Sequence, residues 1–403
     1  MTRVDILSIE AASGHKSAAE ALRYALEARQ PTWNVRVIDL GDVLQHQSRL
    51  LRLAFGFGMG FFNWCMRRER YFFFVTSVRF WILVTLLVTR LQACTFLLRR
   101  TSRFWSDGAP DVVISVTPMM HTIVYEAARC LNPKVHCITI PVDYCEMVPG
   151  YWYQPAIDQH YLLGSQQLVD DAIAGGVPES EWQRLSGMVI DVRFYGAEPI
   201  ERGEFLRSLG LDPALPTGVI SFGGQGTVNV LRCARAIGDA KIPTNLICLC
   251  GRNEGLLKTL QSLDSPFPIA ALRFDPEPPV TILRTADYLI GKPGVMTLTE
   301  ALITDTPLIF IESQGLSTVQ GANEQWVLEQ ETGVMADSPE SVPGSVRQVL
   351  EDDQIHARIQ DAQHRGVFDA LAAIEAIVSE NTLRQDVPRP LGLLPRPPKT
   401  LAE

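Results

Sequence analysis

Three polar turns that contain glycine carry residue types suited to holding a phosphorylated ligand. The first is SFGGQGT at residues 221–227, which follows an apolar run and precedes the helical pattern VNVLRCARAI. Gly223 and Gly224 would let backbone amides approach a diphosphate beside Gln225, and the following helix would add the positive end of its dipole. A tight turn without a ligand uses the same residue types, so this turn does not decide the question alone.

The second turn is GKPGVMTLTEAL at residues 291–302. Gly294 lies in the turn, Thr297 follows at the expected helix start, and Glu300 comes one helical turn later. A carboxylate at this place can accept hydrogen bonds from both hydroxyls of a ribose, as acids do in dinucleotide sites. The spacing TxxE is equally that of a capping box, in which Thr297 and Glu300 would serve only the helix start. Both interpretations stay open from the sequence.

The third turn is SQGLSTVQGANEQW at residues 313–326, again between a strand-like run and a helix. Gln320 and Asn323 carry amides that can bond sugar hydroxyls as donors and as acceptors. Ligands of open α/β sheets bind at the carboxyl ends of the strands, so three polar turns on one edge outline a site.

Two further residues have side chains suited to proton transfer. His15 lies in AASGHKSAAEA (11–21), a small-residue turn that leads into a helix. A histidine there can act as a general base, or it can cap the helix without any catalytic part. Asp143 in PVDYCEMVPGYWY is the second candidate, as a base or as an orienting carboxylate, although acids are common in exposed turns.

The elements that would position these residues alternate between β-branched apolar runs and helical patterns, which predicts βαβ units and parallel sheets. The first series of predicted strands comprises 4–10, 34–40, 111–116, 134–140 and 159–164. The second series comprises 217–222, 245–250, 268–274, 287–291 and 307–312. We therefore expect an α/β protein with two Rossmann-like domains.

The expected domain boundaries follow from these two series and from the glycine and proline between them. The first domain would span 1–195 and the second 196–368, with the linker inside 194–203. Residues 369–385 would form a helix that crosses back to the first domain, and the proline-rich residues 386–403 would be a disordered tail.

An insert at residues 50–105 interrupts the first domain and differs from it in charge. Residues 49–105 contain ten arginines and one acid, Glu69, in a chain whose net charge is −9. Such asymmetry indicates that this segment faces an anionic partner. Its longest uninterrupted apolar stretch, FWILVTLLVT, is shorter than the roughly 20 residues that span a bilayer.

The spacing of the insert favours a helix that lies in a membrane surface. Arg68, Arg79 and Arg90 recur every eleven residues, which is about three helical turns and places them on one stripe. Aromatic residues such as Trp81 and Trp105 would enter the headgroup region while the arginines meet anionic phosphates. A pair of helices buried in the first domain, with arginines extending to its surface, is the alternative.

These motifs together resemble a known family. SGHKSAAEAL, PDVVISVTPMM (110–120), GMVI (187–190) and GKPGVMTLTEAL followed by QGAN are similar to the monogalactosyldiacylglycerol synthases and processive diacylglycerol glycosyltransferases of glycosyltransferase family 28. The likeness covers most of residues 4–340. It departs at Ala12-Ser13-Gly14-His15, where the synthases have GGGH, and at Val116-Thr117-Pro118, where they have a VHP triplet with a histidine near the cleft.

The resemblance implies a GT-B fold, two Rossmann-like domains that face each other across a cleft. It implies inverting, metal-independent transfer of a hexose from a UDP-sugar to a membrane lipid, namely diacylglycerol, and no cofactor. The chain indeed has no DxD triplet, and its eight cysteines are scattered without metal spacing. The family's histidine falls on His15, its ribose acid on Glu300 and its sugar-binding amides on Gln320 and Asn323.

The expected partners are a UDP-sugar, a lipid acceptor and an anionic membrane surface on the cytoplasmic side, where the protein would be peripheral, and no nucleic acid. Two other functions fit the same motifs. One is a UDP-sugar epimerase of the same architecture, and the other is a relative that binds lipid or nucleotide without catalysis. The epimerase would need no lipid surface.

Overall fold

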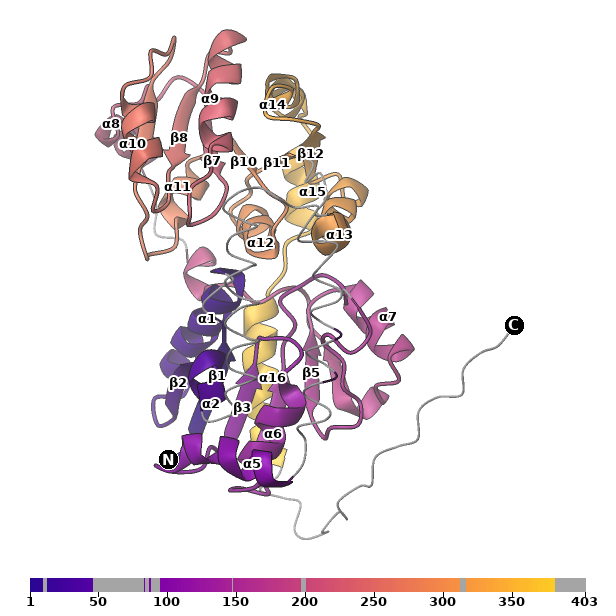
Figure 1. Ribbon diagram of the computed structural model, residues 1–403. Coiled ribbons are helices and arrows are strands. Elements are labelled where there is room, and N and C mark those ends of the chain that lie inside the picture. The colour runs from indigo at the N-terminus through magenta and orange to yellow at the C-terminus, as the bar shows by residue number, and fades with distance from the viewer. Residues whose placement is uncertain are drawn as a thin grey trace.

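The protein is described by a computed structural model, whose described residues are 1–9, 13–45, 83, 87, 95–146, 148–196, 201–311 and 317–380. Within these residues the chain forms two α/β domains, one above the other in Figure 1, each built on a parallel sheet of six strands. Parallel strands need crossover connections, and helices provide most of them here.

The first sheet has the strand order β2-β1-β3-β4-β5-β6. Its strands are β1 (Arg3–Ser8), β2 (Asn34–Asp39), β3 (Val112–Ser115), β4 (His136–Thr139), β5 (His160–Leu163) and β6 (Trp182–Arg184). The direction of strand succession reverses between β1 and β3, so the loops that follow these two strands diverge to opposite faces at a topological switch point.

The second sheet has the order β12-β11-β10-β7-β8-β9. The direction of strand succession reverses between β7 and β10, which is the switch point of this sheet. Its strands are β7 (Thr217–Ser221), β8 (Asn245–Leu249), β9 (Ile269–Leu272), β10 (Tyr288–Gly291), β11 (Leu308–Ile311) and β12 (Gly333–Ala336). The ten predicted strands all occur, each one to three residues shorter than expected. The short strands β6 and β12 were not predicted.

Helices cover both sheets. Those of the first half are α1 (Ser13–Arg29), α2 (Leu40–Gln45), α5 (Thr95–Thr101), α6 (His121–Arg129) and α7 (Gln166–Ala174), with the 3₁₀ turns η1 (Ser102–Trp105), η2 (Glu179–Glu181) and η3 (Val192–Phe194). Those of the second half are α8 (Arg202–Ser208), α9 (Asn229–Asp239), α10 (Glu254–Gln261), α11 (Val280–Arg284), α12 (Val295–Ile303), α13 (Ser317–Glu329), α14 (Val342–Glu351) and α15 (Ile355–Asp361).

The last helix, α16 (Gly366–Glu380), returns to the first domain and lies beside α1 (Figure 1). Its buried side chains join the hydrophobic cluster of the first sheet, and Glu375 accepts hydrogen bonds from Arg29 at 2.8 Å and from Gln30 at 2.6 Å. The chain returns through a close contact at the GMVI motif, where a Cβ added to Gly187 would lie 2.1 Å from His364 Cγ. This contact requires a glycine.

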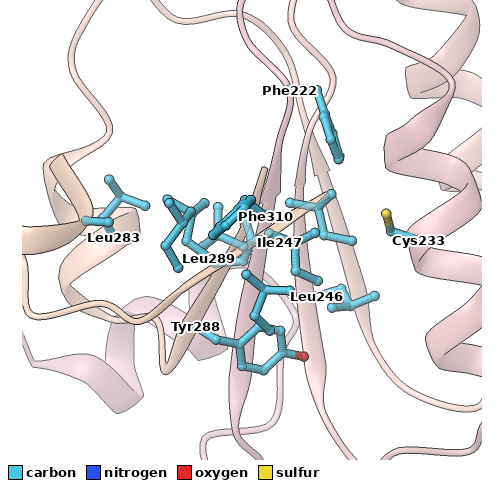
Figure 2. Packing of buried hydrophobic residues seen from close by; sticks show 14 of the residues in the cluster. Phe222, Cys233, Leu246, Ile247, Leu283, Tyr288, Leu289 and Phe310 are labelled. Carbon is cyan, nitrogen blue, oxygen red and sulfur yellow. The ribbon is translucent and has the colours of Figure 1, made fainter. Parts of the chain in front are cut away.

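The core of the second domain is a layer of apolar side chains between its sheet and helices. Figure 2 shows members of this core on both faces of the sheet, among them Leu246 and Ile247 of β8, Leu289 of β10, Phe310 of β11 and Cys233 of α9. These side chains are at most 1% exposed. Burial of this kind stabilises the fold by about 25 cal/mol per Å² of apolar surface.

Trp105, at the end of the insert, corrects one expectation. It is 1% exposed, packs in the core of the first domain and donates from Nε1 to Asp5 Oδ2 at 2.6 Å. Asp5 is also held by a bidentate ion pair with Arg36, both bonds 2.8 Å long. Trp105 is therefore a core residue of the first domain and is not a membrane contact.

The remaining membrane candidates, Arg68, Arg79, Trp81 and Arg90, lie outside the described residues. Of the insert's centre, Leu83 and Leu87 are described as helical, and their side chains are 60% and 58% exposed. In the described ranges no helix combines the length and apolar character needed to cross a bilayer.

Candidate functional site

The glycine turn after β7 has a backbone that only glycine fits. Gly223 has φ of +90° and Gly226 has φ of +68°, both in the left-handed region. A Cβ on Gly226 would lie 1.9 Å from the carbonyl oxygen of Cys250. The turn therefore brings bare backbone to the switch point of the second sheet, as the sequence predicts for Gly223, Gly224 and Gln225.

Lys292, directly after β10, lies against this turn, and the sequence analysis did not single it out. Its Nζ would be 3.9 Å from a Cβ on Gly223, although Lys292 and Gly223 are 69 positions apart. Burial lowers the pKa of the lysine, and no hydrogen bond or ion pair is found for its ammonium group within the described chain. A desolvated cation with no protein partner is costly, which suits a place where an anion binds.

The start of α12 removes one of the alternatives for Glu300. The N-cap of α12 is Gly294, and Thr297 is the third residue inside the helix, so Thr297 and Glu300 do not form a capping box. The capping interpretation is therefore wrong. Glu300 lies one turn further along, partly buried, and burial with the nearby Asp191 raises its pKa to about 8. A carboxyl group this perturbed is typical of a functional site.

Of the two amides in the third turn, the structure describes the side chain of Asn323 but not that of Gln320. Asn323 of α13 is 4% exposed, and its Nδ2 donates to the carbonyl oxygen of Pro293 at 2.7 Å. It thus fixes the turn between Lys292 and Gly294. Gln320 lies in the first turn of α13, and its side chain is outside the described atoms.

An aromatic side chain lies beside the glycine turn and was also not predicted. Phe274, just after β9, is 40% exposed, and the guanidinium carbon of Arg252 lies 3.9 Å from its ring centroid. A Cβ on Gly224 would be 3.3 Å from Phe274 Cε2. An exposed ring with a cation over it offers a stacking surface for a planar base.

His15 occupies the switch point of the first sheet. It is the third residue of α1, and its Nδ1 lies 2.6 Å from the carbonyl oxygen of Val116, which follows β3. The bond joins two different elements, so the helix-capping interpretation of His15 is wrong. Because a carbonyl oxygen only accepts, Nδ1 carries the hydrogen, and among the described residues no hydrogen-bond partner is found for Nε2.

Asp143 shares a tryptophan with His15. Trp152 donates from Nε1 to Asp143 Oδ2 at 3.0 Å, and its ring centroid is 6.2 Å from that of His15. Burial raises the pKa of Asp143, and the nearby His15 partly opposes this rise. Asp143 is thus a partly buried, hydrogen-bonded carboxyl group near the imidazole, not an exposed turn acid.

A second histidine lies behind this pair. His121, at the start of α6, bonds through Nε2 to the carbonyl oxygen of Thr117 at 2.8 Å, and its ring centroid is 6.3 Å from that of Trp152. Burial lowers its pKa to about 4. Although Thr117 replaces the histidine of the VHP triplet, a neutral imidazole still lies close by, stacked near Trp152.

The two switch points meet at the contact between the domains. Helix α1 packs against α12, and a Cβ on Gly14 would lie 3.6 Å from Met296 Cγ (Figure 1). His15 therefore lies next to the helix that carries Glu300. One domain contributes the imidazole of His15, and the other contributes a glycine turn, a desolvated lysine and a partly buried acid. In the described part of the chain no cluster of three or more potential metal ligands is found.

Comparisons with known proteins show which proteins the chain resembles. No family model matches the chain. It is 26% identical over 403 residues to a probable monogalactosyldiacylglycerol synthase 2, chloroplastic, from Oryza sativa subsp. japonica, covering 92% of this chain and 80% of the relative. The chain is a glycosyltransferase of the GT-B fold.

Solved structures confirm the fold of this glycosyltransferase. MurG of Acinetobacter baumannii superposes with a TM-score of 0.56 at 14% identity, covering 93% of this chain and 100% of MurG. A complex of S. aureus MnaA with UDP superposes with a TM-score of 0.57 at 12% identity, covering 97% of this chain and 100% of MnaA. The predicted α/β architecture and the resemblance to the galactolipid synthases are thus confirmed.

Proposed function

We propose that this glycosyltransferase moves a hexose from a UDP-sugar to a hydroxyl group of a membrane lipid, diacylglycerol, with inversion at the anomeric carbon. The observation that carries the proposal is the contact between the two switch points. It places the imidazole of His15 next to α12, whose start lies beside the glycine turn and Lys292.

On the donor side, each part of a UDP-sugar has a fitting group. The amides of the turn at Gly223–Gly226 and the Lys292 ammonium group fit the diphosphate, and Glu300 fits the ribose hydroxyls. The exposed ring of Phe274 fits the uracil base, and Gln320 remains the predicted partner of the sugar hydroxyls. Donor groups of this kind need no metal ion, since Lys292 supplies the positive charge.

On the acceptor side, His15 Nε2 would take the proton of the lipid hydroxyl as its oxygen attacks the anomeric carbon. The bond between that carbon and the diphosphate oxygen breaks, and UDP leaves with the electron pair. Turn amides and Lys292 would stabilise the charge that develops on UDP. The partly buried Asp143 near the ring would stabilise the imidazolium that forms.

The lipid acceptor would reach the site through the first domain at the cytoplasmic membrane surface. Leu83 and Leu87 are each helical, and both expose their apolar side chains. The arginines predicted for the same segment, with Arg99 and Arg100 exposed at its described end, would meet anionic lipid headgroups. This peripheral attachment needs no spanning helix.

The proposal is tested with the full chain, UDP-galactose, UDP-glucose or UDP-N-acetylglucosamine, and anionic vesicles that contain diacylglycerol. We expect a β-linked glycolipid from one of these donors, equally in the presence of EDTA. His15→Ala should lower transfer by about 10²- to 10⁴-fold while UDP affinity stays unchanged. Near-normal transfer by this variant would exclude the role of His15, and epimerisation of the donor without vesicles would favour the epimerase instead.

A further inference from the structure

Tyr144, next to Asp143 in the sequence, has its side chain in the other domain. Within the described part of residues 141–153, it is the residue that joins the hydrophobic cluster of the second domain, whereas Val142, Tyr151 and Trp152 join that of the first. Its side chain is buried, at 5% exposure. Asp143 and Tyr144 thus connect one loop to both halves of the site.

The Tyr144 ring lies between the two helices that carry the predicted donor residues. Its centroid is 5.6 Å from the ring centroid of Trp326 in α13, an arrangement that is favourable for aromatic pairs. Thr299 of α12 lies beside the Tyr144 hydroxyl and opposes the rise in its pKa that burial causes. Thr299 is the direct neighbour of Glu300, and α13 holds the Gly294 turn through Asn323.

The backbone of Tyr144 is fixed to the first domain. Its carbonyl oxygen accepts a hydrogen bond of 2.6 Å from Ser165 Oγ, which also caps α7 by accepting from the Leu168 amide at 3.0 Å. The residue is therefore held at its main chain by one domain and at its ring by the other. A shift of α12 or α13 would move the ring and, through one peptide bond, the main chain of Asp143.

We propose that Tyr144 is a positioning residue that transmits occupation of the donor site to Asp143 and, through Trp152, to the surroundings of His15. This inference rests on the proposed function, in which α12 and α13 bind the UDP-sugar. When the donor fixes these two helices, the Tyr144 ring fixes the loop at 141–153. The carboxyl group that stabilises the His15 imidazolium is then in place only when a donor is bound.

The first test separates catalysis from donor binding. Tyr144→Leu should lower kcat on the order of 10- to 100-fold and change the KM for the UDP-sugar far less, because misplacement at a reacting centre costs rate more than affinity. Tyr144→Phe keeps the ring against Trp326 and should retain kcat within about threefold. Trp326→Leu should reproduce the loss, and the double variant should lose little more than either single variant.

Tyr195→Leu is the control, since Tyr195 is a partly buried aromatic residue that packs against the hydrophobic clusters of both domains. Its ring packs at 5.0 Å on Phe368 of α16, and no ring contact or hydrogen bond with α12, α13 or Asp143 is found for it in the described ranges. This variant should keep kcat even if it lowers stability. An equal loss of kcat in Tyr195→Leu, or an unchanged kcat in Tyr144→Leu, would overturn the inference.

A second measurement does not depend on transfer. Hydrogen exchange of the unaltered chain should show that UDP slows exchange in the second domain and also in residues 141–153. In Tyr144→Leu, UDP should slow exchange in the second domain alone. Protection of 141–153 that survives in this variant would overturn the inference while leaving the proposed function intact. Failure of the unaltered chain to bind UDP would overturn the proposed function and the inference with it.

Discussion

Glu300 offers a prediction in which stability and function oppose each other. An ordinary glutamate loses its proton near 4.5, but in the folded chain the pKa of Glu300 is raised to about 8. Between these values the unfolded chain has released the proton that the folded chain still holds. Stability contributed by this group is therefore complete below pH 4.5, falls as the pH rises, and levels off above about 8.

The size of the effect follows from the same shift. Each pKa unit corresponds to about 1.4 kcal/mol, so the full shift would be roughly 5 kcal/mol. Because Glu300 keeps some contact with water, we expect about half of that value, ~2 kcal/mol. Glu300→Gln is neutral at every pH. The variant should match the unaltered chain near pH 5 and be about 2 kcal/mol more stable near pH 8.5.

Urea unfolding at the two pH values, followed by tryptophan fluorescence, measures this difference. The control is Glu351→Gln, at an exposed position. The difference in stability between this variant and the unaltered chain should be the same at both pH values. At pH 8.5, where Glu300 is ionised, Glu300→Gln should also weaken UDP binding about tenfold, since an amide then replaces the charged acceptor of the ribose hydroxyls. A stability difference that is the same at both pH values, or that disappears at pH 8.5, would refute the reasoning.

Two further substitutions test the diphosphate site. Lys292→Met should weaken UDP binding by about tenfold or more in calorimetry but leave uridine binding unchanged, because uridine has no phosphate; an equal loss for both ligands would contradict the assignment. Gly226→Ala should destabilise the chain by about 3 kcal/mol or more in thermal unfolding, since its Cβ meets a backbone carbonyl at positive φ. Gly255→Ala, whose Cβ meets the Asn253 side chain at an ordinary 3.5 Å, should be tolerated.

The parallel sheets were predictable because their buried strands are continuous β-branched runs, and this pattern is local. Strand β6 is WQR and β12 is GVMA, too short and too mixed to stand out. Trp105 misled the sequence analysis because it ends a basic, aromatic segment, while the partner that defines it, Asp5, is 100 positions away.

The glycine turn of the site was predictable because its glycines indicate the local backbone conformation directly. Lys292 and Phe274 were missed because a single lysine or phenylalanine has no spacing to recognise; they come near the glycine turn only once β7, β9 and β10 have joined one sheet. The reverse holds for Asn323, whose place in a polar turn favoured ligand binding, although its amide holds Pro293.

The return of α16 to the first sheet has a consequence for how the protein folds during synthesis on the ribosome. Val367, Leu371 and Ile374 complete the apolar layer of a domain whose strands were synthesised some two hundred residues earlier. Until these residues emerge, the nascent first domain exposes apolar surface beside α1. Such exposed surface promotes aggregation. A fragment that ends before residue 366 should therefore depend on chaperones, and adding a separate α16 peptide should rescue its solubility.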